Sequence, residues 1–489
     1  MLPRDGRPHD RGRGIALTTV TFEAYALPSG TDRGDVRPID VRATDRGEPA
    51  LEYAVPELDE EMAGALVGAL RRAGETLAGR SAVDIADSLG RVGERFLDDD
   101  DEVRRAALDL LPATAALSPQ MARTILDGMA RDWSRKQLAS LLEHEFGDVA
   151  RLERLVSVRG TDAMAIGPRL CLQIVSGSVP GVGVNAAIRS LIVKGPTLLK
   201  PGLGDVVLPV LFARALQEED AELADAMAVV YWPGGTETEI ERAALAEADV
   251  VVVYGSDNAV TTLRARAAPT ARFVGYHHRV SVGVVGRAAL TEGAVAGAAR
   301  DVASSVAMFD QRGCVCPQVV YVEEGGDFTP HDFSERLAVA LAGLEVDLPG
   351  GPLDVAEAAA VHQLRGNAEL HAATGSGQVF HGGEQASWTV VYEPTAKSGP
   401  AGLARSIRVR PLRDAGDLRN QFGELGGHLQ TIGVAGLAGR LGELAPAWGR
   451  LGASRITPFN RVPFPPPWWL HDGRHPLRDL VRWVESEES

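Results

Sequence analysis

The sequence at residues 169–200 is RLCLQIVSGSVPGVGVNAAIRSLIVKGPTLLK, and its pattern changes along its length. The apolar run at 169–175 predicts a strand, and the glycine and proline residues of 177–183 predict a turn. Residues 184–193 then predict a helix, and residues 197–200 predict a second strand. A strand, a helix and a strand in this order form a β-α-β unit with parallel strands. This segment therefore predicts a parallel sheet.

The same alternation continues along the chain. Helices are expected at 206–218 and 237–246, and strands at 227–231 and 249–254. This order is typical of a doubly wound parallel sheet with helices on both faces, in which ligands bind beyond the carboxyl ends of the strands. The residues expected there are small, hydroxylated or basic, and they suit a nucleotide: Ser176, Gly177, Lys200, Pro201, Gly235, Gly255 and Ser256.

Two features indicate which nucleotide. Gly181, Gly183 and Ala186 imitate the G-x-G-x-x-G/A pattern, whose glycines let a pyrophosphate approach backbone amides. Lys200 stands at the end of the next strand, where an NAD site usually keeps a carboxylate for the ribose hydroxyls. An ammonium there favours a 2′-phosphate and hence NADPH over NAD. The alternative is that Lys200 only caps its strand.

Composition excludes several classes of protein. The chain has 489 residues, 45% of them hydrophobic, and a formal net charge of −16, which argues against nucleic acid or an anionic membrane as its main partner. No run of apolar residues is long enough to span a membrane. The three cysteines form no disulfide framework, and residues 1–14 lack the apolar core of a signal peptide. We therefore expect a cytoplasmic protein.

A second chemical feature lies at 310–318, with the sequence DQRGCVCPQ. The apolar spacing of 291–309 predicts a helix before it, so Cys314 should lie on a loop behind a buried helix. Gly313 frees the backbone beside the thiol, and Pro317 prevents the helix from restarting. Cys314 is thus a candidate nucleophile. Two alternatives are a metal half-site with Cys316, which lacks a second pair because only Cys171 remains, and two small buried hydrophobes.

These features divide the chain into four parts. Residues 1–14 are expected to be a mobile tail, and 15–271 a cofactor-binding domain whose N-terminal part includes a hairpin of strands at 16–26 and 36–43 and a helical region. Residues 272–425 should form a second α/β domain, the catalytic one, which carries Cys314. Residues 426–489 should return to the cleft and to an interface, through the run PFPPPWW at 463–469, and end in a short helix.

A nucleotide-type sheet followed by a domain with a thiol resembles the aldehyde dehydrogenase superfamily, and within it the LuxC-type acyl-CoA reductases. The resemblance covers nearly all of the chain from Gly47. It is carried by Gly177-Ser-Val-Pro180, Arg189-Ser-Leu191, Lys200, Gly255-Ser256, Arg279-Val-Ser281, Phe309-Asp-Gln311, Cys314, Pro317-Gln318, His428-Leu-Gln-Thr431, His471-Asp-Gly473 and Leu480-Val-Arg-Trp483.

The resemblance implies a fold and a set of roles. The fold would be an aldehyde dehydrogenase-like α/β architecture, with a doubly wound parallel-sheet cofactor domain and a second α/β catalytic domain. Cys314 would be the acylated cysteine, Gly255-Ser256 the turn near the nicotinamide half of the cofactor, and Lys200-Pro201 the contact to the adenosine ribose.

Two departures from the superfamily pattern refine the function. Hydrolytic aldehyde dehydrogenases carry a glutamate that activates water, and the corresponding place near 275–278 has no carboxylate. An acyl-enzyme without such a base can instead accept hydride or exchange with a thiol. Ser178 stands where an asparagine usually donates to the oxyanion, and the loss of a well-placed donor can cost about 3 kcal/mol of barrier. The Ser178 hydroxyl and the backbone N–H of Cys314 can still donate.

The expected function is therefore reduction of an acyl thioester to an aldehyde with NADPH through an acyl-enzyme on Cys314. The substrate would be an acyl-CoA or an acyl-carrier thioester, delivered free or by an acyl-transferring or acyl-activating partner enzyme, and the protein would be a homo-oligomer without metal. The alternatives are a hydrolytic NAD(P)-dependent aldehyde dehydrogenase and a catalytically weak structural subunit of a multienzyme complex. His277 and His278 are expected on a strand, pointing to opposite faces, so that they cannot act together.

Overall fold

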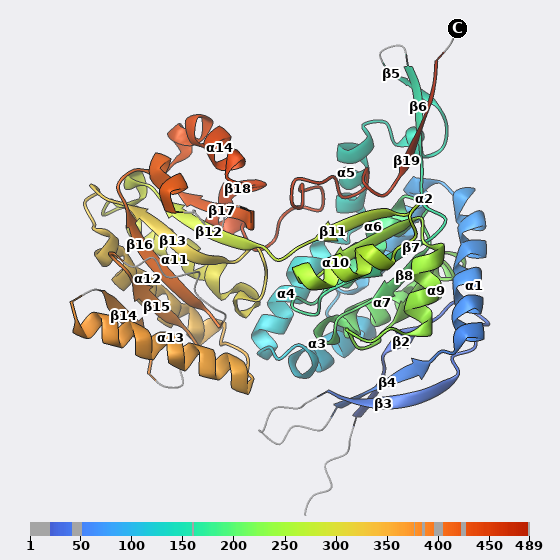
Figure 1. Cartoon of the computed structure of the whole chain (residues 1–489), viewed down its shortest axis with the longest axis horizontal. Helices are drawn as coiled ribbons and strands as arrows, with labels where there is room; N and C mark the ends of the chain where they lie inside the picture. Colours follow the sequence, from blue (N-terminus) through green and yellow to red (C-terminus); the bar gives the residue numbers. More distant parts are fainter. Residues whose placement is uncertain are drawn as a thin grey trace, which may run out of the picture.

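Figure 1 shows the computed structural model of the chain, which describes residues 20–41, 51–158, 161–375, 377–383, 387–395, 404–421 and 427–487. Two α/β regions lie side by side, each built on a sheet that helices cover. This arrangement confirms the expected doubly wound sheet with a second α/β region. The predicted tail at 1–14 lies outside the described residues. Among the residues described, no helix combines the length and the apolar composition needed to cross a bilayer.

The first sheet has six strands in the order β11-β10-β7-β8-β9-β2. Its five parallel strands are β7 (Cys171–Ile174), β8 (Thr197–Lys200), β9 (Met227–Val230), β10 (Val250–Tyr254) and β11 (Arg272–Tyr276), and β2 (Tyr25–Ala26) pairs antiparallel with β9. The chain proceeds from β7 outward to β9 and then returns to β10 on the other side of β7. The strand order therefore reverses between β7 and β10, and such a switch point forms a crevice for ligands.

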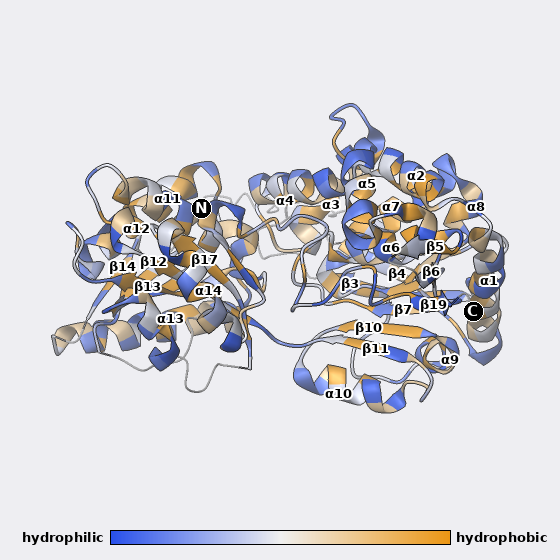
Figure 2. Ribbon diagram, turned by 90° about the horizontal axis from the view of Figure 1, so that it is seen from above, coloured by the Kyte–Doolittle hydropathy of each residue, from blue (hydrophilic) through white to orange (hydrophobic). Residues whose placement is uncertain are grey.

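The helices between these strands agree with the sequence pattern to within a few residues. They are α6 (Val182–Ile192), α7 (Val207–Glu219), α8 (Ala221–Ala224), α9 (Glu239–Glu247) and α10 (Asp257–Arg266). Four consecutive valines of β10 are buried, because helices cover both faces of a doubly wound sheet. Figure 2 shows these strands as a hydrophobic layer between helices with hydrophilic outer faces.

The helical region expected from residue 56 onward consists of α1 (Glu60–Ala78), α2 (Ala82–Arg95), α3 (Glu102–Thr114), α4 (Pro119–Asp132) and α5 (Arg135–Phe146). Asp101 caps α3 by accepting a hydrogen bond from the amide of Val103, so the acidic run before this helix is a helix entry. Helices α4 and α5 extend toward the second region and contribute to the cavity described below.

The predicted hairpin near the N-terminus is wrong. The strands β1 (Val20–Glu23) and β3 (Asp35–Val41) both pair with β4 (Leu51–Glu57), in the order β1-β4-β3. In β4 the buried residues Leu51, Tyr53 and Val55 alternate with less buried ones, a strand pattern that stands directly before the first helix. The central strand of this small sheet was therefore missed, and the two outer strands were paired with each other.

The second sheet has seven strands in the order β14-β15-β16-β13-β12-β17-β18, and only β14 is antiparallel to its neighbour. Its strands are β12 (Val280–Val285), β13 (Pro317–Glu323), β14 (Gln378–His381), β15 (Thr389–Tyr392), β16 (Ser406–Leu412), β17 (Leu429–Ala435) and β18 (Arg455–Pro458). Its helices are α11 (Val295–Ala307), α12 (Pro330–Asp347), α13 (Val355–Ala373) and α14 (Leu441–Arg450).

The chain passes between the two sheets at residues 277–279. Residues 272–285 thus form two strands, of which β11 belongs to the first sheet and β12 to the second. The C-terminal part contributes more to the second sheet than expected, because both β17 and β18 belong to it.

The end of the chain forms a third small sheet, which projects from the first region (Figure 1). The strand β19 (Arg482–Ser486) pairs antiparallel with β6 (Thr161–Ile166), which pairs with β5 (Val156–Val158). The predicted final helix is therefore wrong, because the ladder with β6 holds this segment extended. The buried carboxylate of Glu145 in α5 anchors the same segment by accepting hydrogen bonds from the amides of Leu477 and Arg478, each at 3.0 Å.

Candidate active site

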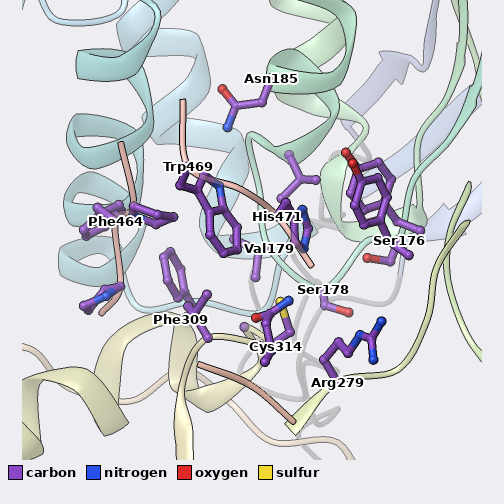
Figure 3. Close-up of a pocket in the computed structure, with 18 of the residues that line it drawn as sticks. Ser176, Ser178, Val179, Asn185, Arg279, Phe309, Cys314, Phe464, Trp469 and His471 are labelled. Atoms are coloured by element: carbon purple, nitrogen blue, oxygen red, sulfur yellow. The ribbon is translucent and has the colours of Figure 1, made fainter. Parts of the chain in front are cut away.

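A cavity of about 470 Å³ lies where the two regions meet. Its walls come from six parts of the chain: the turns that follow β7 and β10, the helices α4 to α6, residues 276–279 between the two sheets, the loop at 309–318, Gln430 of β17, and the C-terminal segment at 463–471. Figure 3 shows side chains from these parts pointing into one space, with the sulfur of Cys314 among them. The cavity therefore includes Ser176, Ser178, Gly255, Ser256 and Cys314 from the residues that the sequence had indicated.

The loop that carries Cys314 is tightly fixed. Helix α11 ends at Ala307 because Phe309, Asp310 and Gln311 have positive φ angles of 57°, 49° and 63°. Such angles cost side-chain-bearing residues about 1–3 kcal/mol each and persist only where other contacts hold them. Here Asp310 forms a buried ion pair with Arg405 at 2.7 Å, and Gln311 exchanges hydrogen bonds of 2.8–2.9 Å with the backbone of Ser406.

The thiol of Cys314 faces the cavity, whereas the two other cysteines are buried. Burial among protein atoms and the negative charge of Asp472 raise the pKa of the Cys314 thiol to about 11, although Gln430 and two backbone amides favour the thiolate. Cys316 donates to the carbonyl of Met308 at 3.3 Å and packs beside the loop. In the described part of the chain, no group of three metal-binding side chains includes a cysteine.

A carboxylate near Cys314 corrects one expectation. The sequence pattern at 275–278 offered none, but Asp472 from the C-terminal segment lies close enough to affect the thiol. Its side chain is only 3% exposed, and its two oxygens accept hydrogen bonds from Gln430 Nε2 at 2.7 Å and from Arg279 Nε at 2.8 Å. The carboxylate is therefore occupied by two donors, and it is not among the groups that line the cavity.

A stack of four aromatic rings forms one wall of the cavity. Tyr254 lies 4.5 Å from Tyr276, Tyr276 lies 4.4 Å from His471, and His471 lies 4.5 Å from Trp469, measured between ring centroids. The rings are within about 21° of parallel. The stack connects the ends of β10 and β11 to the C-terminal segment. Burial lowers the pKa of His471 to about 4, so its imidazole is neutral at pH 7.

The composition of the Pro/Trp run at 463–469 predicted that it packs against a neighbouring segment. In the structure it lines the cavity together with other parts of the same chain. Phe464 fits against Gly128 of α4, where a side chain would come within 2.2 Å of its ring, and it meets Phe309 edge-on at 5.3 Å. Together with Met129, Leu138 and Leu141 these residues give the cavity a largely apolar side. The charged residues Asp132 and Arg189 line the cavity as well. Burial raises the pKa of Asp132 to about 7.

The turn after β10 can hold a negatively charged cofactor. Ser256 caps α10 by accepting a hydrogen bond from the amide of Ala259 at 3.3 Å. The amides of Asp257 and Asn258 make no hydrogen bond to the residues that the structure describes, so the positive end of α10 remains open. Gly255 and Ser256 line the cavity with Ser176, at the point where the strand order reverses. A pyrophosphate fits this environment.

The glycine pattern before α6 is not such a site, which corrects the sequence interpretation. The amides of Gly181 and Gly183 donate to the two carboxylate oxygens of Asp205, at 2.6 and 2.7 Å. Asp205 is fully buried, and its burial raises its pKa to about 7. The protein's own carboxyl group therefore occupies this helix N-terminus.

The other predicted cofactor residues lie on the same edge of the sheet but outside the cavity lining: Gly177, Lys200, Pro201 and Gly235. Lys200 ends β8 and is only 8% exposed, with its ammonium 5.5 Å from the ring centre of Tyr231. Burial lowers the pKa of Lys200. Gly177 packs against the loop after β8, because a side chain at Gly202 would come within 2.1 Å of its amide.

His277 and His278 do not lie on a strand, so the prediction that they point to opposite faces of a strand is wrong. Both lie between β11 and β12 and both line the cavity. His277 pairs with Asp257 at 3.1 Å, and the carbonyl of His278 accepts a hydrogen bond from His428 at 3.1 Å.

Comparison with known proteins gives consistent results. A family model described as acyl-CoA reductase (LuxC) matches residues 77–483. The long-chain acyl-protein thioester reductase of Aliivibrio fischeri is 24% identical over 407 residues, which cover 82% of each chain. The sequence therefore agrees with this family over most of its length.

Solved structures agree with the fold. A NAD-dependent aldehyde dehydrogenase from Sinorhizobium meliloti has a TM-score of 0.72 at 15% identity and covers 97% of this chain and 95% of its own. An NADP-dependent enzyme from E. coli has a TM-score of 0.73 at 16% identity and covers 95% of this chain and 98% of its own. The architecture is thus that of the aldehyde dehydrogenases.

Proposed function

The chain belongs to the LuxC family of acyl-CoA reductases, and on this premise we propose that it reduces an acyl thioester to an aldehyde with NADPH through an acyl-enzyme on Cys314. The observation that carries the proposal is the thiol of Cys314, which opens on a cavity with an apolar side and a helix N-terminus suited to a dinucleotide. Acyl chain, thiol and cofactor can therefore meet in one space.

In the first half of the reaction, the sulfur of Cys314 attacks the thioester carbonyl and the donor thiol departs. Negative charge develops on the carbonyl oxygen, and we propose that the hydroxyl of Ser178 and the backbone N–H of Cys314 donate to it. Figure 3 shows Ser178 beside Cys314. The rigid loop from Phe309 to Gln311 keeps the thiol at a fixed position relative to these donors.

For the cofactor we propose a binding surface that consists of Ser176, Gly177, Lys200, Pro201, Gly235, Gly255 and Ser256. NADPH, when bound, supplies the hydride that reduces the acyl carbon. Lys200 supports the preference for NADPH, because the nearby carboxylate of Glu241 is engaged by the indole of Trp232 at 2.9 Å and by Arg266. That carboxylate is therefore not free to bind ribose hydroxyls or to repel a 2′-phosphate.

Hydrolysis is the competing outcome, and Asp472 is the group that favours it. Its carboxylate lies near Cys314, but both of its oxygens accept hydrogen bonds from side chains. The ion pair with Arg279 and the hydrogen bond from Gln430 stabilise the charged carboxylate and make it a weaker base, so we propose that the acyl-enzyme waits for hydride. An aldehyde as the main product supports the proposal, and a carboxylic acid contradicts it.

The apolar side of the cavity supports a fatty acyl group as the substrate. The relative from Aliivibrio fischeri is named for long-chain acyl-protein thioesters, which favours a donor of this kind, either free acyl-CoA, an acyl carrier or a partner enzyme. We further propose that the protein forms a homo-oligomer, for which the projecting sheet of β5, β6 and β19 offers exposed edges.

Intact-mass spectrometry tests the proposal directly. After incubation with acyl-CoAs of increasing chain length, the wild type should gain one acyl group, and NADPH should remove it with release of aldehyde. Cys314→Ala should gain none, whereas the matched control Cys316→Ala should behave like the wild type, because Cys316 only packs. An adduct that survives Cys314→Ala would overturn the assignment of the nucleophile.

A further inference from the structure

Acyl transfer to Cys314 releases a proton, and that proton needs an acceptor. The thiol is held in its protonated form at neutral pH, because burial and Asp472 raise its pKa to about 11. Direct ionisation would leave only about one molecule in ten thousand reactive at pH 7. A base that takes the proton as the sulfur attacks would remove this limit.

Few groups around the cavity can act as this base. Asp472 already accepts two hydrogen bonds and is not part of the lining. His277 has Asp257 as its partner at 3.1 Å. Asp132 lies on the apolar side formed by α4 and α5. His278 also lines the cavity and lies beside His428, with the two rings 6.2 Å apart. His471 is the remaining imidazole of the lining, and Figure 3 shows its ring above Cys314 and Ser178 in this view.

We infer that His471 is the general base of acyl transfer: it takes the proton of the Cys314 thiol and returns it to the departing thiol. This inference rests on the proposed function, and it assigns a role to a residue that carried part of the family resemblance without a role of its own. The neutral ring can accept a proton because no hydrogen bond within the described residues occupies its nitrogens.

The stack of rings fixes the direction in which His471 can act. Tyr276 covers one face of the imidazole at 4.4 Å and Trp469 covers the other at 4.5 Å. Both faces are therefore closed, and only the edge of the ring with its nitrogens can meet the substrate. Arg455 lies over Trp469 at 5.5 Å and supports the outer end of the stack.

The charged neighbours of His471 keep it in the accepting form. Burial, Arg189 on α6 and Arg279 before β12 lower its pKa to about 4, and only Asp472 on its own segment opposes them. Tyr254 and Tyr276 face it as neutral rings, since burial raises the pKa of both hydroxyls. At any pH above about 5 the imidazole is thus unprotonated, but its low pKa makes it a weak base, so it takes the proton only as the bond between sulfur and acyl carbon forms.

The step balances. A bond forms between the sulfur of Cys314 and the acyl carbon, and the bond from that carbon to the donor sulfur breaks. The thiol proton passes to the imidazole of His471 and from there to the donor sulfur, which leaves as a neutral thiol. No electrons are gained or lost until hydride arrives.

The test is single-turnover acylation of Cys314 by acyl-CoA, followed by rapid quench and mass spectrometry between pH 5.5 and 10. His471→Phe keeps an aromatic ring in the stack but removes the nitrogens. We expect it to slow acylation at pH 7 by about 100-fold or more. Its rate should rise about tenfold per pH unit as the thiol ionises, whereas the wild-type rate should stay nearly level over this range.

The matched control is His144→Phe. His144 stacks on Trp468 at 4.3 Å, next to the ring that His471 contacts, but it does not line the cavity. This variant should acylate at the wild-type rate and with the wild-type pH profile. If His471→Phe does not fold, His471→Gly replaces it, and added imidazole should restore acylation.

Two results would overturn the inference. One is acylation of His471→Phe at nearly the wild-type rate, and the other is a slow rate with an unchanged pH profile, which would indicate a packing role. A wild type that takes no acyl group on Cys314 would refute the proposed function itself, so the two failures are distinguishable.

Discussion

Two turns at the carboxyl edge of the first sheet precede helices, and they differ in what binds their backbone amides. At the turn before α6, Gly181 and Gly183 donate to the buried carboxylate of Asp205. At the turn before α10, the amides of Asp257 and Asn258 have no hydrogen-bond partner among the described residues. The first turn has the better glycine pattern, but only the second can accept a phosphate. Whether the amides of such a turn are available to a phosphate is thus decided by a residue from another part of the chain that packs against the turn.

The largest expected effect on stability comes from removing the carboxyl group of Asp205 at the turn before α6. Asp205→Ala removes the acceptor of two buried amides, and each unsatisfied buried donor costs about 1–3 kcal/mol. We expect the free energy of unfolding to fall by about 3 kcal/mol in urea denaturation at pH 6. Asp205→Asn keeps one acceptor oxygen and should lose less. Equal stability of Asp205→Ala and wild type would contradict a structural role for this carboxylate.

The pH dependence of stability should reveal the same carboxyl group. Its pKa is about 7 in the folded protein and near 3.8 in the unfolded chain, so the folded state holds the proton more tightly. The stability that this proton contributes is fully present below about pH 4 and is lost as the pH rises through 7. Urea midpoints measured from pH 4 to 8 should therefore fall less steeply for Asp205→Asn than for wild type.

The turn before α10 can be blocked by adding a carboxylate there, as Asp205 blocks the turn before α6. Ser256→Asp keeps a helix cap but places a negative charge where the cofactor pyrophosphate is expected, and we predict about 100-fold weaker NADPH binding. Ser256→Asn caps the helix without the charge and should bind within a few-fold of wild type. Titration of NADPH fluorescence measures both. If the two variants bind alike, the pyrophosphate lies elsewhere.

The smallest effect concerns the lysine between the two turns. Lys200→Met should reduce the preference for NADPH over NADH by about 10-fold, equivalent to about 1.4 kcal/mol, since it removes the charge proposed to meet the 2′-phosphate. Lys136→Met, on the exposed side of α5, is the matched control. Binding constants for both cofactors decide the question, and an unchanged ratio would leave Lys200 only as the cap of β8.

Much of the fold follows from local pattern. The β-α-β alternation from 171 to 266 could be predicted because strands and helices bury residues with different periods, and these periods are visible in the sequence. Cys314 and Gly255-Ser256 could be predicted to lie at a cavity because glycine and proline mark the loops that carry them, whereas the role expected of Ser178 came from the family resemblance. The strand β4 was missed because it is followed directly by a helix, and β19 because its partner β6 lies far away in the sequence.

The missed site residues share one property. Asp205, Asp472 and His471 act on parts of the chain that are distant from them, and no spacing rule connects Asp205 to Gly181 or Asp472 to Gln430. Their partners are set by the tertiary structure. Two signals were available: the Pro/Trp run at 463–469, whose composition indicated a packing segment, and His471-Asp-Gly473, which carried part of the family resemblance without a role for its side chains.

The position of that wall has a consequence for how the protein is made. Residues 463–471 complete the cavity, and Glu145 then holds the segment that follows them. The last strand of the second sheet, β18, ends at Pro458, so a growing chain on the ribosome can complete both large sheets just before this segment emerges, and the enclosed cavity should form only at the end of synthesis. A message truncated shortly before codon 463 would yield a chain with most of its core and no enclosed site.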